Sequence, residues 1–172
     1  MDWTALSALG TVFQNTAITK FNELYFFADA ALPARCFYQV PSFVEVSLPK
    51  NTTATNSGTA SFNGCTNLKV YCPEGFINMP YASFNNCTNT TIVLPTTFTT
   101  IGNNAHYSGS YTLVIKAMTP PLLGNSNNNK ITKVYVPDAS VDTYKAADGW
   151  SGIASKIFPL SEYEGSIVSP VW

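Results

Sequence analysis

The sequence predicts a mostly-β fold, a solenoid of about five to six short repeats with a cap at each end, in one domain of 172 residues. Two neighbouring stretches, SFNGCTNLKVYCP and SFNNCTNTTIVLP, repeat one pattern at an offset of 22 residues. Each is rich in strand-forming residues before its proline. A unit of this length cannot bury its own apolar face, so it must stack on copies of itself. The copies share an aromatic residue, a cysteine and a proline: Phe62, Cys65 and Pro73, then Phe84, Cys87 and Pro95.

The same pattern recurs along the chain, with decreasing clarity away from these two copies. Its leading aromatic residues are spaced by 24, 25, 22 and 23 residues, which matches the period of leucine-rich repeats. A sixth β-rich segment, ITKVYVP, covers 131–137. The sequence therefore predicts a single leucine-rich-repeat solenoid over 1–163. The leading aromatic residues are Phe13, Phe37, Phe62, Phe84 and Tyr107.

Alternation along each predicted strand assigns its side chains to two faces. The inner face takes pairs of apolar residues, and we expect the leading aromatic residues to stack as a ladder beside them, with Cys65 next to Cys87. The second half of each unit lacks the length of a helix, so we expect a turn and a short 3₁₀ or irregular segment on the opposite wall. The predicted inward pairs are Val46 and Leu48, Val70 and Cys72, Ile92 and Leu94, and Val134 and Val136.

Segments at both ends predict caps that shield the terminal repeats. In the N-terminal cap, 1–12, apolar residues recur at helical spacing and stop at a glycine. In the C-terminal cap, 134–163, we expect Asp138 or Ser140 to cap a short helix that carries Tyr144. Four further residues are expected to close the open end of the core: Trp150, Ile153, Ile157 and Phe158.

The repeat resembles the BspA-type leucine-rich repeats of Bacteroidetes and related surface proteins. The resemblance is carried by the Phe-x-x-Cys-Thr-x-Leu start at 62–68, by strands that end in proline, and by the IGNNA close at 101–105. The segment 134–163 is similar to the terminal unit of that family, and these features together cover 35–163.

Three residues depart from the family pattern. Thr90 stands where leucine is usual, and His106 and Tyr107 replace the usual Ala-Phe neighbourhood. The resemblance nevertheless implies display on a bacterial surface, hence an extracellular or cell-surface location. It also implies binding of a protein or glycan partner without catalysis.

Composition and motifs disfavour other classes of function. With 11% charged residues and a net charge of −1, the chain has no electrostatic reason to bind nucleic acid. No apolar run approaches the length of a membrane span. No CxxC occurs and His106 is the only histidine, so we expect no metal or cofactor. Without a catalytic motif, and with Glu162 and Glu164 interpreted as a solvated pair, we expect no enzyme.

The cysteines and the N-x-T sequences have structural interpretations. Stacked Cys65 and Cys87 would point in parallel, which disfavours a disulfide between them. We therefore expect all four cysteines to be free thiols. The sequons begin at Asn51, Asn86 and Asn89, two of them within the repeat consensus, and we interpret these residues as turn residues.

The outward face of the predicted strands is the candidate binding surface, because solenoids present such rows to partners. Alternation also places Val93 and Val114 on this face, and tyrosines there supply amphipathic contact area. Ordinary solvent-facing positions are the alternative interpretation, and the polar loops 51–60 and 124–130 are a second candidate surface. The candidate residues are Glu45, Lys69, Tyr71, Thr91, Lys116, Lys133 and Tyr135.

The tail, 164–172, is apolar and has no repeat to join. We expect it to dock on a neighbouring subunit rather than fold back on its own chain, because exposed apolar residues favour a partner surface. Deletion of 166–172 should then weaken assembly and leave the melting temperature of the monomer nearly unchanged. The candidate assembly residues are Ile167, Val168, Val171 and Trp172.

Three functions remain open at this point. The first is a non-catalytic recognition or adhesion module that binds protein or glycan at a bacterial surface. The second is a structural component of a phage virion, such as a decoration, fibre or tail protein, that uses the repeat for attachment. The apolar tail and a start at Met1 without a recognisable signal peptide favour this second function. A protein inhibitor that offers its concave face to an enzyme is the third.

Overall fold

The computed structural model describes residues 17–22, 35, 37–48, 60–79, 82–102, 105, 108–124 and 129–169. The predicted N-terminal cap, 1–12, lies outside these residues. So do Phe13, His106, Tyr107 and the fourth cysteine of the chain, Cys36.

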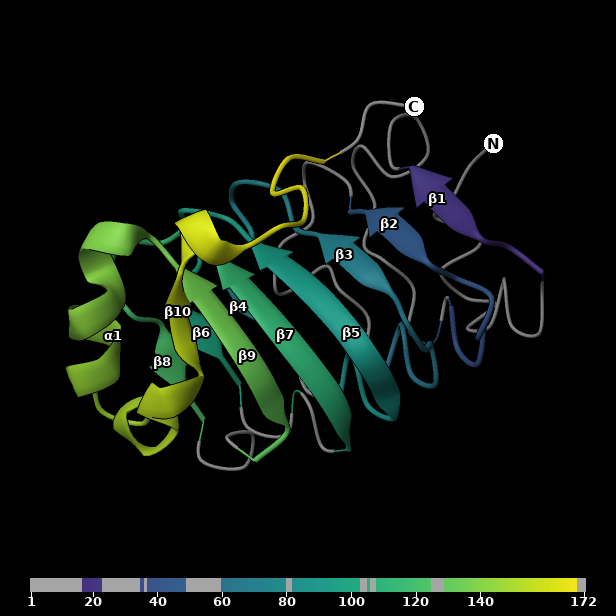
Figure 1. Cartoon of the computed structure of the whole chain (residues 1–172). Coiled ribbons are helices and arrows are strands. Elements are labelled where there is room, and N and C mark those ends of the chain that lie inside the picture. Colours follow the sequence, from purple (N-terminus) through teal and green to yellow (C-terminus); the bar gives the residue numbers. More distant parts are fainter. Residues whose placement is uncertain are drawn as a thin grey trace.

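Seven strands form one parallel sheet in which consecutive repeats lie side by side (Figure 1). Every neighbouring pair runs parallel, as stacked copies of one unit require. The prediction of a mostly-β repeat fold is confirmed to this extent, while the boundaries of the solenoid and its caps stay predictions. The strands in spatial order are β1 (Lys20–Asn22), β2 (Glu45–Ser47), β3 (Lys69–Tyr71), β5 (Cys87–Leu94), β7 (Gly109–Ile115), β9 (Ile131–Val136) and β10 (Ile157–Pro159).

The opposite wall differs from the expected turn with 3₁₀ or irregular chain. It carries a second parallel sheet of three strands, which Figure 1 shows behind the large sheet. The carbonyl oxygen of Ile77 accepts hydrogen bonds from the N–H groups of Thr99 and Thr100, at 2.9 and 3.1 Å. Stacking thus satisfies the backbone N–H and C=O groups of these segments, which are too short for apolar and polar residues to alternate visibly in the sequence. The strands are β4 (Asn78–Met79), β6 (Thr100–Ile101) and β8 (Leu122–Leu123).

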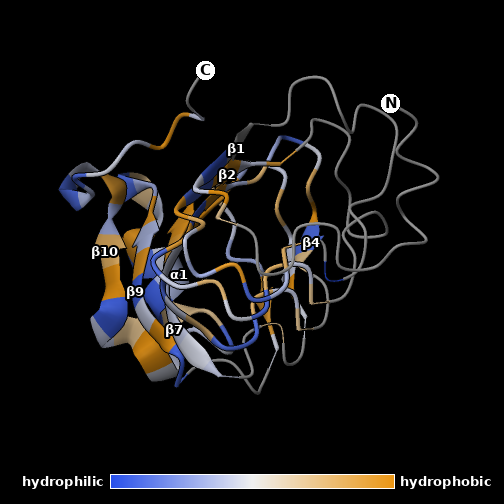
Figure 2. Ribbon diagram, turned by 90° about the vertical axis from the view of Figure 1, so that its right-hand side faces the viewer, coloured by the Kyte–Doolittle hydropathy of each residue, from blue (hydrophilic) through white to orange (hydrophobic). Residues whose placement is uncertain are grey.

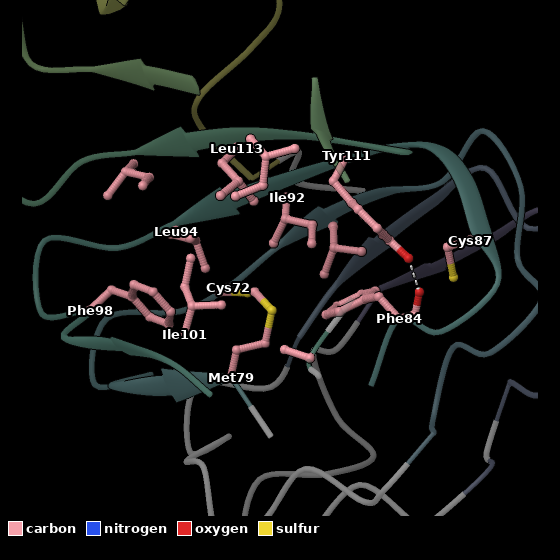
Figure 3. Close-up of a cluster of buried hydrophobic side chains, with 14 of the residues drawn as sticks. Cys72, Met79, Phe84, Cys87, Ile92, Leu94, Phe98, Ile101, Tyr111 and Leu113 are labelled. Atoms are coloured by element: carbon pink, nitrogen blue, oxygen red, sulfur yellow. Dashed lines mark hydrogen bonds between the residues drawn. The ribbon is translucent and has the colours of Figure 1, made fainter. Parts of the chain in front are cut away.

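The core lies between the two sheets (Figure 3). The rings of Phe37 and Phe62 stack with 5.4 Å between centroids, and those of Phe62 and Phe84 with 5.2 Å. A second stack joins Phe76 and Phe98 on the other side of the core, at 6.0 Å. The predicted aromatic ladder is confirmed for its three described members. The predicted inward pairs are buried as well: Val46, Leu48, Val70, Cys72, Ile92, Leu94, Val134 and Val136.

A ladder of thiol hydrogen bonds runs beside the aromatic ladder. The Cys65 thiol donates to the carbonyl oxygen of Phe37 at 3.1 Å, and the Cys87 thiol donates to that of Phe62 at 2.9 Å. Each thiol therefore points at the backbone of the preceding repeat and not at the other thiol. Together with Cys72, these cysteines are free, which confirms the prediction for the three described cysteines.

A tyrosine hydroxyl replaces the thiol in the next rung of this ladder. Gly109 pairs with Cys87 in the register of β5 and β7, so the cysteine position has no side chain there. The hydroxyl of Tyr111 lies within hydrogen-bond distance of the carbonyl oxygens of Phe84 and Ser108. Its phenol is buried, and burial raises its pKa. The repeat thus keeps the rung while changing the residue that supplies the donor.

We expect the three described thiols to resist alkylation in the folded protein. Burial raises the pKa of Cys65 to about 11, and it also raises the pKa of Cys72 and of Cys87. The thiol of a cysteine in the unfolded chain has a pKa of about 8.5. The stability that these thiols confer is therefore complete below that pH, and it falls as the pH rises through the folded pKa, because the unfolded chain then binds fewer protons.

Maleimide labelling at neutral pH, followed by peptide mapping, measures this protection residue by residue. Protein unfolded in urea is the control in which the thiols label freely. Native labelling of Cys65 or Cys87 at the rate of the unfolded chain would contradict the buried thiol ladder.

The C-terminal unit closes one end of the core. Tyr144 and Trp150 meet edge to face at 5.4 Å and are fully buried. The Tyr144 hydroxyl donates to the carbonyl oxygen of Ala117 at 2.8 Å, and the Trp150 indole N–H donates to that of Pro121 at 2.7 Å. Ile153 and Ile157 are buried as predicted. The unit consists of η2 (Asp138–Ser140), α1 (Val141–Ala146), η3 (Ser151–Lys156), β10 and η4 (Leu160–Glu162).

One expectation for this unit is wrong, and a second is confirmed only for the position of the cap residue. Phe158 does not close the core: it pairs with Tyr135 in the strand register, and their rings lie 5.9 Å apart on the outward face. Ser140 is the N-cap residue of α1, but neither it nor Asp138 makes a side-chain cap hydrogen bond. The Asp138 carboxylate instead accepts the N–H of Ser161 at 3.1 Å, which ties η2 to η4.

Candidate binding surface

The strand register arranges the outward side chains of the large sheet in two rows. Successive side chains of a strand point to opposite faces, so the residues on either side of each inward residue face outward. The first row, named here the polar row, is Glu45, Lys69, Thr91, Thr112 and Lys133. The second row, named here the covered row, is Ser47, Tyr71, Val93, Val114 and Tyr135.

The sequence predicted that the covered row faces solvent, but the central residues of this row are buried. Tyr71, Val93 and Val114 are only 5, 2 and 0% exposed. Residues 160–169, named here the C-terminal segment, run across the row, on the opposite side of the large sheet from β4 (Figure 2). An apolar strip on an outward sheet face is thereby removed from water. The residues of the segment that pack on the strip are Leu160, Tyr163 and Ile167.

Lys69 is the residue that connects the polar row to the C-terminal segment. Its ammonium donates to the carbonyl oxygen of Ser166 at 2.8 Å. The same nitrogen lies 5.0 Å from the ring centroid of Tyr71 and 5.4 Å from that of Tyr163, within cation–π range of both. Tyr163 also packs against Tyr135 at 5.0 Å, and burial together with that neighbour raises the pKa of Tyr163.

The outcome for the predicted assembly tail follows from these contacts. Ile167 packs on the chain's own sheet, so the expectation that the tail docks on a neighbouring subunit rather than on its own chain is wrong for this residue. A hydrogen bond of 2.5 Å between the hydroxyls of Ser47 and Ser169 carries the segment as far as β2. Val168 is 70% exposed. Val171 and Trp172 lie outside the described residues.

The polar row remains accessible beside the C-terminal segment. Glu45 pairs with Lys20 at 3.5 Å, and Lys133 is exposed at the other end of the row. Between them, Thr91 and Thr112 are half-buried neighbours on β5 and β7. This row is the part of the predicted surface where hydrogen-bonding side chains meet solvent at a regular spacing.

An asparagine ladder borders the polar row. Asn89 donates its side-chain amide to Asn67 at 2.7 Å, and Asn86 donates to Asn63 at 3.3 Å. Asn86 and Asn89 adopt left-handed φ values of 57 and 54°, as turn residues do. Asn86 lies in a turn, as predicted. Asn89 instead lies within β5, at the irregularity between Cys87 and Thr90, so its interpretation as a turn residue is wrong. Asn51 lies outside the described residues.

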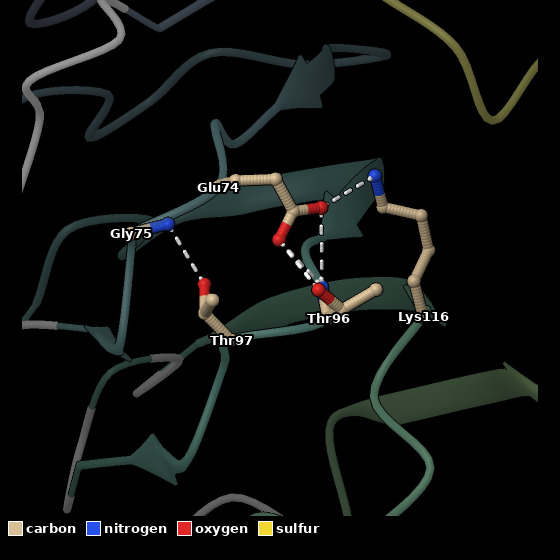
Figure 4. A network of polar contacts seen from close by, with 5 residues as sticks. All are labelled: Glu74, Gly75, Thr96, Thr97 and Lys116. Carbon is tan, nitrogen blue, oxygen red and sulfur yellow. Dashed lines mark hydrogen bonds and ion pairs between the residues drawn. The ribbon is translucent and has the colours of Figure 1, made fainter.

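Lys116 does not belong to either row. Strand β7 ends at Ile115, and the Lys116 ammonium reaches a carboxylate oxygen of Glu74 at 3.2 Å (Figure 4). Burial opposes the ionisation of Glu74, but hydrogen bonds from Thr96 and Lys116 outweigh it, so the pKa of this carboxyl is lowered. The pair forms a polar rim at the carboxyl ends of β3, β5 and β7.

An open cavity of about 420 Å³ brings together residues from β9, β10 and the C-terminal segment. Lys133 and Tyr135 were candidates from the sequence, whereas Phe158, Tyr163 and Gly165 were not. The sequence gives little indication of these three residues. Strand β10 is only three residues long, and it reaches β9 only when the C-terminal unit is folded. Glu162 and Glu164 are exposed at the rim, as the solvated-pair interpretation expects.

The surface supplies hydrogen bonds, aromatic contact and a few charges, which suit binding. Among the described residues, no group of three or more metal-ligating side chains occurs. No helix in the described part of the chain has the length and apolar character to cross a membrane. His106 and most of the two candidate loops, 51–60 and 124–130, lie outside the described residues.

The comparisons with known proteins identify the repeat. The model of the BspA type leucine-rich repeat region matches residues 30–138, in six copies. No curated protein matches the chain.

Proposed function

This chain belongs to the BspA-type leucine-rich repeat family, and from that premise we propose that it is a recognition or adhesion module that binds protein or glycan at a bacterial surface. Repeat domains of this family serve as protein-binding or adhesion modules, are generally non-catalytic and are typically surface-associated. The observation that supports the proposal is the polar row, which β2, β3, β5, β7 and β9 hold in register on one outward face.

The geometry of the polar row suits an extended partner. Neighbouring strands of a sheet lie about 4.8 Å apart, so each strand offers one side chain at a constant interval. Threonines occupy the centre of the row, and charged residues occupy its ends, from Glu45 to Lys133. A partner that follows the row meets two hydroxyl groups between charged side chains, so the row offers hydrogen bonds together with a few charges.

A matched pair of arginine substitutions tests the proposal. Thr112→Arg places a bulky charge in the middle of the polar row, and Leu122→Arg places the same side chain on the opposite wall, where Leu122 is 70% exposed. Binding is measured against a panel of purified extracellular-matrix proteins and against a glycan array.

The expected result is at least one ligand that binds the wild-type protein and Leu122→Arg but is lost with Thr112→Arg. Equal loss in both variants would place the contact elsewhere. Absence of any ligand for the wild-type protein in both panels would contradict the recognition function itself.

The exposed end of the C-terminal segment favours a second candidate function, a structural component of a phage virion. Val168 is 70% exposed and precedes two further apolar residues, Val171 and Trp172, which suits burial against a neighbouring subunit. Light scattering at increasing protein concentration tests this candidate. A Val168→Asp variant that stays monomeric, where the wild-type protein assembles, would support it. A wild-type protein that remains monomeric throughout would contradict it.

A further inference from the structure

The covered row is an apolar strip that already has an occupant. Three side chains, Tyr71, Val93 and Val114, stand next to one another on adjacent strands and are almost fully buried. They form a cluster separate from the main core. The C-terminal segment shields this cluster from solvent, whereas the main core lies between the two sheets. The apolar strip of the sheet can therefore bind a peptide segment that crosses the strands, as the C-terminal segment does.

The C-terminal segment contacts this strip through a short pattern of side chains. Tyr163 and Ile167, four residues apart, rest on the apolar cluster. Between them, the carbonyl oxygen of Ser166 accepts the Lys69 ammonium at 2.8 Å. The pattern is an aromatic residue, an aliphatic residue four positions later and an accessible backbone carbonyl between them. The segment bends at Gly165 and Val168, so another peptide with that pattern presents the same groups to the sheet when it follows the same bent path.

The segment is held by few polar contacts. Within the described part of the chain, two hydrogen bonds join residues 164–169 to the sheet, one from Lys69 to Ser166 and one between Ser47 and Ser169. The segment does not pair with a strand of the large sheet. Val168 is exposed. Such a segment opens at lower free energy than a strand in the sheet.

The occupant also leaves an open space beside the carboxyl ends of the strands. A cavity of about 260 Å³ separates the segment from the carboxyl ends of the strands. Ile167 and Val168 line one side, Tyr71 and Val93 line the other, and the ion pair of Glu74 and Lys116 stands at the rim. A peptide with a larger apolar side chain at the position of Ile167 would fill this space and exclude water from the strip more completely.

We infer that the covered row is a docking groove for a peptide segment of a protein partner, and that the C-terminal segment is an internal occupant which the partner displaces. The partner peptide carries an aromatic residue and, four positions later, a large aliphatic or aromatic residue. This inference rests on the proposed recognition function and narrows its partner to a protein. Lys69 holds the carbonyl group of either occupant, the chain's own or the partner's.

A fluorescent peptide of residues 163–172 is the probe, and the full chain is the receptor in every measurement. Ile167→Asp releases the segment from the strip, because a carboxylate is not tolerated against Tyr71 and Val93. We expect this variant to bind the peptide, and we expect the wild-type protein to bind it at least about tenfold more weakly, since the tethered segment competes at an effective concentration on the order of millimolar.

Two altered peptides serve as controls. The peptide with Ile167→Asp is expected not to bind, and the peptide with Ile167→Phe is expected to bind the Ile167→Asp protein several-fold more tightly than the native peptide, because it fills the cavity. A second receptor variant, Lys69→Ala, is expected to weaken binding of every peptide. Lys145→Ala, a lysine on the exposed face of α1, is the matched control with unchanged binding. Circular dichroism confirms that each variant is folded.

Equal binding of the native peptide to the wild-type protein and to Ile167→Asp, or binding to neither folded protein, would overturn the inference. So would tight binding of the peptide that carries Ile167→Asp. If the array finds only glycan ligands, and if Ile167→Asp leaves their binding unchanged, the groove is not the recognition site although the recognition function stands. If both panels fail while the peptide binds, the recognition function fails and the groove remains.

Discussion

Replacement of Phe62 by alanine is expected to lower the free energy of unfolding by about 3–5 kcal/mol, the usual range for a buried phenylalanine. Phe62 is 2% exposed, and its ring stacks between those of Phe37 and Phe84, at 5.4 and 5.2 Å. Neighbouring repeats hold both rings in place, so the cavity cannot close by a local shift. Urea denaturation of the purified variant measures the loss.

Ile77→Ala is the matched control on the opposite wall. Ile77 is 48% exposed, and truncation there is expected to change the free energy of unfolding by no more than about 0.5 kcal/mol. A decrease of less than about 1 kcal/mol in the free energy of unfolding of Phe62→Ala would show that the aromatic ladder contributes little to the stability of the core.

Gly109→Ala is expected to be the most damaging of the glycine substitutions. A Cβ atom at Gly109 would lie 1.9 Å from the carbonyl oxygen of Cys87 and 2.5 Å from the hydroxyl of Tyr111, and the backbone has φ of +134°. The strained backbone costs about 1–3 kcal/mol. Displacement of the Tyr111 hydroxyl removes one of the two donors to the carbonyl oxygen of Phe84, the other being the N–H of Cys87 at 3.3 Å, at a further cost of about 0.5–1.5 kcal/mol.

Gly152→Ala in η3 provides the comparison for this variant. A Cβ atom there has no neighbour within 4 Å, and the residue has no positive φ. Its free energy of unfolding is expected to stay within about 0.5 kcal/mol of the wild-type value. Thermal and urea denaturation of the two variants side by side give the difference. A Gly109→Ala protein as stable as Gly152→Ala would mean that β7 adapts without cost.

The hydrogen bond from Tyr111 could not be predicted from the repeat spacing. The offset of 22 residues places Gly109 at the cysteine position, and the strand register confirms that pairing. The offset does not reveal which residue supplies the missing donor. Tyr111 pairs with Thr90 on the neighbouring strand, and its long side chain reaches back to the carbonyl oxygen of Phe84. Such a substitution depends on side-chain length in three dimensions, which a linear pattern does not record.

The sequence by itself determined the repeat, its parallel stacking and the inward residues of each strand. Period and alternation are local properties, and a unit that cannot bury its apolar face alone has only its neighbours to stack on. For the same reason the sequence identified Ile92 and Leu94 as core residues and the stacking of Phe62 on Phe84.

Only the tertiary structure decided which outward residues meet solvent. Alternation assigns Tyr71 and Val93 to the outward face, but it cannot say what lies above that face. The cover comes from residues far along the chain: Lys69 meets Ser166 across 97 positions, and Ser47 meets Ser169 across 122. No periodicity links such distant segments, because their contact depends on where the folded C-terminal unit directs the chain. The outward face of the large sheet is therefore a polar row beside a covered row, where the sequence predicted one open face.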